Sequence, residues 1–142
     1  MESVSKKIYV EVLIQAPLET VWECWTQPEH IIRWNQATTE WHCPRASIDL
    51  RPGGHFVYRM EARDGSIGFD FGGTFLEVVP MERISFRLND SREVTIQFTQ
   101  QGKQSHILEA FDPEQINPHE LQLAGWHAIL VSFKKHAEAQ QL

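Results

Sequence analysis

One long amphipathic segment near the end of the chain, residues 117–141, constrains the fold more than any other feature. Asn117 followed by Pro118 is typical of a helix start, because an Asn side chain can cap free amides and Pro lacks the amide that the first turn leaves unpaired. Apolar residues recur at three- and four-residue steps and form one stripe on the predicted helix, made of Leu123, Trp126, Ile129, Leu130, Phe133 and Ala137. The opposite side is polar, with Gln122, Lys134, Lys135 and Glu138. Such a stripe needs an apolar surface to cover.

The first part of the chain predicts one strand and two short helices. Residues 6–15 alternate between apolar and polar positions, which is typical of a strand, and Pro17 ends it. The period then changes to a helical one, carried by Leu18, Val21, Trp22 and Trp25. Pro28 begins a second and shorter helix, which turns Ile31, Ile32 and Trp34 inward.

The middle of the chain predicts a series of antiparallel strands. Residues 35–44 show no clean period, so we expect an ordered loop there. Strands are expected at residues 46–50, 55–62, 67–79, 83–88, 93–100 and 104–111, separated by turns rich in Gly, Asn and Asp. Gly72 and Gly73 interrupt the longest strand and predict a bulge or sharp bend.

Length and composition predict one globular domain over residues 1–142, since 42% of the residues are hydrophobic and 11% are aromatic. No apolar run approaches the roughly 20 residues of a membrane-spanning helix, and the polar start of the chain does not read as a signal peptide. We therefore expect a cytoplasmic protein without a membrane partner. The net charge of −6, without a basic cluster, argues against nucleic-acid binding. Cys24 and Cys43 predict buried, reduced thiols.

The order of these elements predicts an α+β architecture. A meander of six or seven antiparallel strands and one amphipathic helix can bury their apolar faces together when the twisted sheet curls around the helix. A cavity between the sheet and the helix is compatible with this arrangement.

Several motifs in their order resemble the SRPBCC (START-like, helix-grip) superfamily. Within it, the chain resembles the domains similar to the activator of heat-shock protein 90 ATPase, which also carry polyketide cyclase-like labels. The motifs that carry the resemblance are Ala16-Pro17, Val21-Trp22, Trp25-Thr26, Pro28-Glu29, Arg33-Trp34, Asp49-Leu50-Arg51-Pro52-Gly53-Gly54, Gly73, Glu77-Val78, Pro80-Met81-Glu82-Arg83-Ile84 and Gly125-Trp126. The resemblance implies a helix-grip fold. It does not select one function, because this fold hosts lipid carriers, hormone receptors, cyclases, hydratases and chaperone regulators.

Large rings are the main candidates for a ligand-binding interior. Many rings around one helix favour a pocket, although each ring taken alone is more often a core residue. The ring-rich set extends to Trp25, Phe75, Phe86 and Phe98. The predicted ligand-binding residues are Trp34, Asn35, Trp41, His42, Phe56, Tyr58, Met60, Phe71, Trp126, Leu130 and Phe133.

Three polar residues are candidates for catalysis. His42 has an unperturbed pKa that suits proton transfer, while Asp70 or Arg59 could orient it. The simpler interpretation is a structural histidine and a surface pair, because Asp70 faces away from the interior if Phe69 and Phe71 are buried.

No cofactor and no metal site are expected from the sequence. His30, His42, Cys43 and His55 lack the spacing of a metal centre, and no phosphate-binding or dinucleotide-binding motif is present. Neither cysteine has an identifiable base partner.

Three functions follow as hypotheses. The first is binding of a small hydrophobic or aromatic molecule between the sheet and the last helix. The second is an enzyme of cyclase or hydrolase type that uses His42 with Asp70 or Arg59. The third is an interaction module that regulates a chaperone ATPase.

Overall fold

The computed structural model describes residues 6–140, which form seven strands and three helices. The elements in chain order are β1 (Ile8–Ile14), α1 (Leu18–Thr26), α2 (Pro28–Trp34), β2 (Trp41–Ile48), β3 (His55–Ala62), β4 (Gly68–Val79), β5 (Arg83–Leu88), β6 (Glu93–Gln101), β7 (Gln104–Phe111) and α3 (His119–Ala139).

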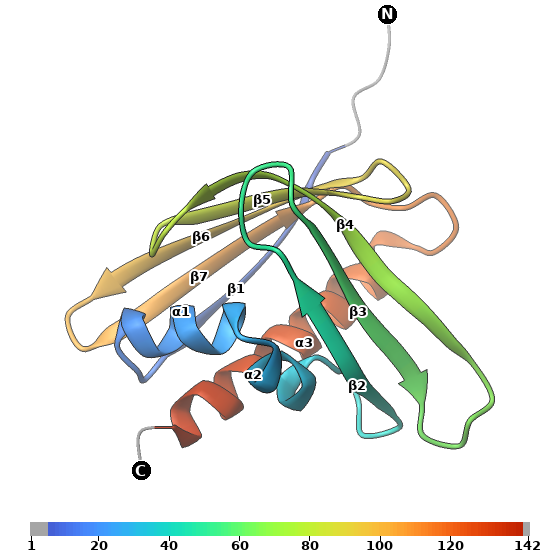
Figure 1. The fold of residues 1–142 in the computed structure, drawn as a ribbon, viewed down its shortest axis with the longest axis horizontal. Coiled ribbons are helices and arrows are strands. Elements are labelled where there is room, and N and C mark those ends of the chain that lie inside the picture. Colours follow the sequence, from blue (N-terminus) through green and yellow to red (C-terminus); the bar gives the residue numbers. More distant parts are fainter. Residues whose placement is uncertain (1–5, 141–142) are drawn as a thin grey trace, which may run out of the picture.

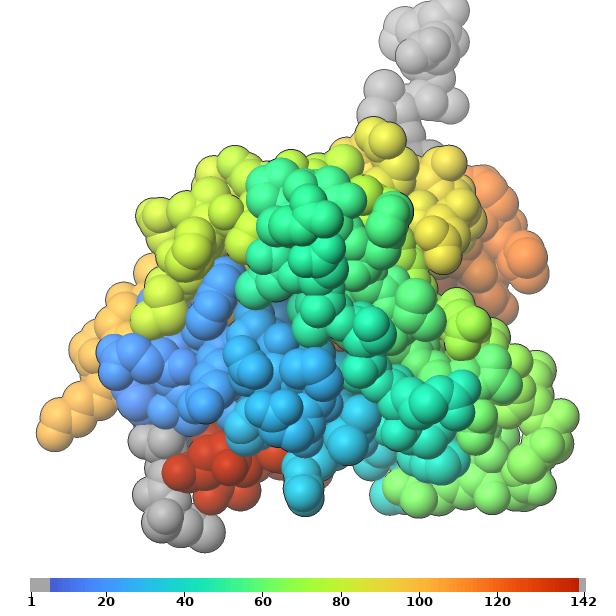
Figure 2. All heavy atoms as spheres, viewed as in Figure 1, coloured from blue at the N-terminus to red at the C-terminus, as the bar shows by residue number. Residues whose placement is uncertain are grey.

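The seven strands form one antiparallel sheet in the order β1-β7-β6-β5-β4-β3-β2. The sheet curls, and α3 runs along its concave side together with α1 and α2 (Figure 1). In the space-filling view, α1, α2 and β2 lie at the front, and the C-terminal turns of α3 reach the lower edge (Figure 2). The predicted helix-grip α+β fold is confirmed, including the two short helices after the first strand.

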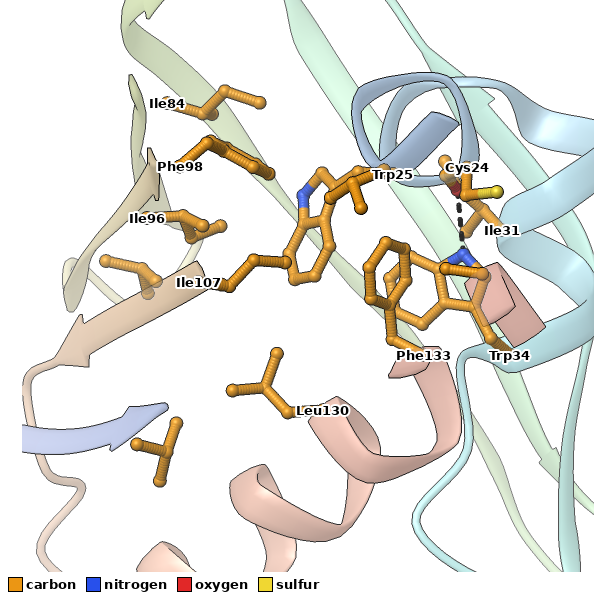
Figure 3. Packing of buried hydrophobic residues seen from close by; sticks show 14 of the residues in the cluster. Cys24, Trp25, Ile31, Trp34, Ile84, Ile96, Phe98, Ile107, Leu130 and Phe133 are labelled. Carbon is orange, nitrogen blue, oxygen red and sulfur yellow. Dashed lines mark hydrogen bonds between the residues drawn. The ribbon is translucent and has the colours of Figure 1, made fainter. Parts of the chain in front are cut away.

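The hydrophobic core lies between the sheet and the helices. Trp25 and Trp34, from the two short helices, pack their rings 4.9 Å apart, and Phe133 of α3 meets both at 4.8 and 4.9 Å (Figure 3). The Trp34 indole donates a hydrogen bond of 2.8 Å to the backbone carbonyl of Cys24. Both cysteines are buried free thiols, as the sequence predicts.

The structure corrects the predicted loop at residues 35–44. Strand β2 begins at Trp41, and its register with β3 shifts between His42 and Arg45. This irregularity surrounds Pro44, which has no backbone amide to donate to a ladder. The bulge disturbs the alternation of apolar and polar residues, and for this reason the sequence predicts a loop where β2 begins.

Of the bulge or sharp bend predicted at Gly72 and Gly73, the bulge is wrong. Both glycines pair regularly with β3, and the register shift of β4 with β5 lies between Phe75 and Glu77. A Cβ atom on Gly73 would lie 2.2 Å from the Arg87 carbonyl oxygen, so the absent side chain permits a close approach of two strands.

The start of the last helix also differs from the prediction. Helix α3 begins at His119 after Pro118, and no side chain caps it. Asn117 instead donates through its side-chain amide to Glu114, at 3.0 Å. The predicted end at Gln141 lies outside the described residues.

The N-terminal part of α3 presents a different face from the predicted one. Gln122, expected on the polar side, is only 7% exposed, whereas Leu123, expected in the apolar stripe, is 45% exposed. The Gln122 amide is buried because it accepts from the amide of Glu114 and donates to the carbonyls of Glu114 and Asn117. The predicted stripe holds further along the helix, where Leu130, Phe133 and Ala137 are fully buried.

None of the helices within residues 6–140 has the length and apolar character needed to cross a bilayer.

Candidate functional site

A cavity of about 350 Å³ lies between the concave side of the sheet and the N-terminal half of α3. A volume of this order is within the range of small-molecule sites in proteins. The cavity reaches the surface beside the start of β4, since Phe69 both lines it and is 47% exposed. Its wall is formed by Trp25, Trp34, Asn35, Ile48, Phe56, Tyr58, Met60, Phe69, Phe71, Phe75, Ile84, Phe86, Arg92, Glu109, Glu114, Asn117, Gln122, Trp126 and Ile129.

Aromatic rings dominate the sheet side of the wall. Phe56 of β3 contacts four other rings at centroid distances of 4.9 to 6.1 Å, those of Tyr58, Phe71, Phe75 and Phe86. The alternation of strands explains this cluster, because Phe56 and Tyr58 point to the same face of the sheet and the register places Phe71 opposite Tyr58.

Trp126 forms the facing wall on α3. Its indole stacks on Phe111 of β7 with ring centroids 3.9 Å apart and planes 10° apart, and it meets Phe71 edge-on at 6.2 Å. The stack on Phe111 fixes the position of the indole, and it leaves Trp126 half-buried at the cavity wall. A ligand would therefore meet a rigid aromatic surface on this side.

Seven of the eleven predicted ligand-binding residues line the cavity: Trp34, Asn35, Phe56, Tyr58, Met60, Phe71 and Trp126. Leu130 and Phe133 lie instead in the solid core, with no exposed surface. Trp41 packs edge-on against Phe69 at 5.9 Å, and neither Trp41 nor His42 lines the cavity. That the seven residues contact a ligand remains a prediction.

The three predicted catalytic residues lie together, but on the outer face of the sheet. Arg59 donates to Glu61 at 2.9 Å and to Asp70 at 3.4 Å, and His42 lies 3.8 Å from Glu61. The register of β3 with β4 places Arg59 directly opposite Asp70 on the outer face. The next pair, Met60 and Phe69, points to the inner face. The Arg59 guanidinium lowers the pKa of Glu61 through their hydrogen bond. None of these residues lines the cavity, so the arrangement is that of a surface ion-pair cluster.

Glu109, the most unusual polar group of the wall, is not among the residues predicted from the sequence. Its side chain is only 6% exposed, and burial raises the pKa of its carboxyl group to about 8. A signal was present in the sequence, since Glu109 is in phase with Ile107 and Phe111 on strand β7, both of which are fully buried. A carboxyl group on the inward face of a strand is rare unless it has a partner or a function.

Three other polar residues of the wall, Glu114, Asn117 and Gln122, form a hydrogen-bond network at the start of α3. Glu114 accepts hydrogen bonds from the backbone amides of Ile116 and Asn117, and these bonds lower its pKa. Gln122 spans the same loop through its side-chain amide. This network holds the chain between β7 and α3 in place.

Tyr58 adds one hydroxyl group to the aromatic wall. Burial raises the pKa of this phenol strongly, and the neighbouring Cys43 thiol acts in the same direction. The hydroxyl group therefore stays protonated at all physiological pH values, and it is available as a neutral hydrogen-bond donor or acceptor.

One group of metal-type donors comes together among residues 6–140, and none of its members lines the cavity. The ligand atoms of Cys24, His30 and His136 lie within 4.8 Å of one another. The two imidazoles already form a direct hydrogen bond of 2.8 Å. Burial and the charges of His30 and Arg33 lower the pKa of His136, and the positive charge of Arg33 also opposes a bound cation.

Comparisons with known proteins agree with this architecture. Residues 15–138 match the family model described as activator of Hsp90 ATPase homolog 1-like protein. The solution structure of the AHSA1-like protein from Aeromonas hydrophila is 42% identical, with a TM-score of 0.90, over 95% of this chain and 94% of that chain. The comparison with curated proteins gave no match.

Two further structures show how widely the fold is shared. A protein from Cytophaga hutchinsonii is 48% identical, with a TM-score of 0.81, and the match covers 95% of this chain and 94% of that one. A crystal structure from Nitrosomonas europaea is only 18% identical and still gives a TM-score of 0.82 over 99% of both chains. With a family model covering residues 15–138, the chain belongs to the family of activator of Hsp90 ATPase homolog 1-like proteins.

Proposed function

We propose that this protein binds a small hydrophobic or aromatic molecule in the cavity between the sheet and α3. The single observation that carries the proposal is the ring-lined space of about 350 Å³ in an otherwise densely packed interior. Apolar and aromatic walls give affinity because they remove the apolar surface of a ligand from water, and a space of this size accepts a small molecule.

The wall has the composition of a binding site for such a molecule. Phe56, Phe71 and Trp126 offer flat apolar surfaces, and only a few polar groups stand among them. Sites of this kind obtain affinity from apolar burial and orientation from isolated polar groups. The enzyme hypothesis based on His42 has less support, because His42, Arg59 and Asp70 lie outside the cavity. The chaperone-regulating hypothesis draws only on the description of the family.

The proposal is tested by screening lipids, aromatic metabolites and polyketides by thermal shift and native mass spectrometry. A hit is then titrated against Ile129→Trp, which places an indole ring in the cavity from the α3 side. We expect this variant to lose at least about tenfold in affinity, since the added ring occupies the volume that the ligand needs.

The matched control is Leu123→Trp. It adds the same ring to the same helix, but at a 45% exposed position that does not line the cavity. We expect unchanged affinity from this variant. Equal loss in both variants, or no ligand from the whole screen, would contradict binding in the cavity. Circular dichroism checks that both variants are folded.

A further inference from the structure

We propose that the ligand carries a basic nitrogen, and that its ammonium group is bound by the Glu109 carboxylate inside the cavity. This inference rests on the proposed function and adds the chemical class of the ligand, an amine on an aromatic or other apolar body. It is carried by the position of Glu109, by its lack of a partner, and by the rings that line the same cavity.

Glu109 faces the interior from β7, which has a neighbouring strand on each side. Strand β7 lies between β1 and β6, and the residues opposite Glu109 in the register are Val10 and Ile96. Both are buried and apolar, so neither neighbouring strand offers a group that could compensate a charge. The carboxyl group is therefore directed to the cavity, whose wall it forms.

Within residues 6–140, the Glu109 carboxyl group has neither a hydrogen bond nor an ion pair, which sets it apart from the other charged groups of the wall. Glu114 accepts from Asn117, and Arg92 is paired with Asp90 at 2.8 Å. No fully enclosed side-chain oxygen or nitrogen atom in the described chain lacks a partner. The Glu109 oxygens must therefore contact the open space of the cavity, where a ligand could reach them.

The surroundings of Glu109 favour a cationic partner over a neutral or an anionic one. An isolated carboxylate is costly in an apolar site, which is why burial raises the pKa of Glu109 to about 8, and an ammonium ion of the ligand would offset that cost. The rings of Trp126, Phe71 and Tyr58 in the same wall also attract a cation through their faces. A ligand carboxylate could not offset that cost, since it would add a second negative charge beside the ionised Glu109.

Three matched probes test the inference: 1-naphthylmethylamine, 1-naphthylmethanol and 1-naphthoate. They share one aromatic body and differ in charge, so that apolar burial is nearly constant across the set. Binding is followed by quenching of tryptophan fluorescence at pH 7.5, because Trp126 and Trp25 line the cavity. We expect the amine to bind at least about tenfold more tightly than the alcohol, as charge-assisted hydrogen bonds in buried sites permit.

Glu109→Gln should abolish this preference while it keeps the shape of the side chain. We expect the affinity of the amine to fall about tenfold or more, and that of the alcohol to change less than about threefold. The control is Glu11→Gln on the neighbouring strand β1, whose carboxyl group is exposed and accepts a hydrogen bond from His106. This variant should retain the selectivity for the amine.

Proton release gives a second readout that a purely structural role would not produce. At pH 6.5 the free Glu109 is mostly protonated, so binding of an ammonium ion should release close to one proton per ligand. Isothermal titration calorimetry in buffers of different ionisation enthalpy measures this number. We expect no release from Glu109→Gln.

The outcomes separate the two proposals. If none of the three probes binds and the wider screen also fails, the proposed function is wrong. If the alcohol or the naphthoate binds as tightly as the amine, or if Glu109→Gln leaves the selectivity unchanged, the cavity binds ligands but the inference about a basic nitrogen is overturned.

Discussion

Glu109 shows at the scale of one residue what a sequence pattern can and cannot reveal. The alternation along β7 puts Glu109 on the same face of the strand as Ile107 and Phe111, and that face is buried in the structure. A single glutamate among the apolar positions of a strand nevertheless looks like an irregularity of the pattern. Its possible function depends on a cavity formed by residues far away in the chain. The cavity has walls from both the sheet and α3, so it cannot be predicted from the sequence of β7 alone.

Gln122 and Leu123 show the same limit on the helix. Hydrophobicity alone places Leu123 inside and Gln122 outside, and the structure has the reverse. The decisive interaction is local but polar, since the Gln122 amide satisfies backbone groups of Glu114 and Asn117 in the preceding loop. The spacing of apolar residues gives no information on such bonds between a side chain and the backbone.

The buried carboxyl group of Glu109 predicts a particular dependence of stability on pH. Its pKa is raised from 4.5 in the unfolded chain to about 8 in the folded protein, so the folded state holds an extra proton between these values. Its contribution is therefore fully favourable below pH 4.5, and it is lost as pH rises through about 8. We expect Glu109→Gln to be more stable than the wild type at pH 9, by on the order of 3 kcal/mol.

Urea denaturation at pH values from 5 to 9 measures this difference. The advantage of Glu109→Gln should be small at pH 5 and should grow with pH. Glu40→Gln, which changes an exposed carboxyl group ahead of β2, should follow the wild-type curve throughout. A constant difference between Glu109→Gln and the wild type would show that ionisation of Glu109 is not the cause.

At the scale of elements, the sequence predicts the strands and helices whose periodicity is regular, and it does not predict a strand that contains a bulge. Strands β3, β5 and β7 lie where alternation predicts them, and so do the two short helices. Strand β2 was partly missed because its bulge between His42 and Arg45 breaks the alternation. The same holds for the residues of the cavity wall. Alternation along β3 predicted that Phe56 and Tyr58 line the cavity, and they do. Periodicity along α3 could not tell that Leu130 and Phe133 lie in the solid core and not at the cavity.

Two glycines in different elements should respond in opposite ways to the same substitution. In β4, Gly73→Ala would set a methyl group 2.2 Å from the Arg87 carbonyl oxygen, and we expect it to lower stability by about 1–3 kcal/mol. In α3, Gly125 has open space at its Cβ position, so Gly125→Ala should raise stability by about 0.5–1 kcal/mol.

Chemical denaturation of both variants at one pH tests this pair, and each serves as the control for the other. The result is informative because the two substitutions add the same methyl group. If Gly73→Ala were neutral, the close approach of β4 and β5 would not be a constraint on the fold. If Gly125→Ala were destabilising, α3 would be packed more tightly at that turn than the structure shows.

At the scale of the whole molecule, the sheet, the helices and the cavity belong to the same apolar interior. Lys134 near the end of α3 donates to the Leu13 carbonyl of β1 at 2.8 Å, and Ser132 donates to the Trp34 carbonyl of α2 at 2.7 Å. These bonds join the last helix to both early parts of the chain. We therefore expect the domain to unfold as one cooperative unit, as is usual for a domain of this size.

Thermal unfolding with and without a ligand tests this expectation. Far-UV circular dichroism reports on the whole backbone, whereas tryptophan fluorescence reports mainly on the helices and the cavity wall. The two signals should give the same Tm. A ligand at 100 times its Kd should raise the free energy of unfolding by about 2.7 kcal/mol, and both signals should shift upward together. If only the fluorescence transition moved, the cavity and its helices would unfold separately from the sheet. The 1–142 chain would then consist of two cooperative units, and the ligand would stabilise only the one that contains α3.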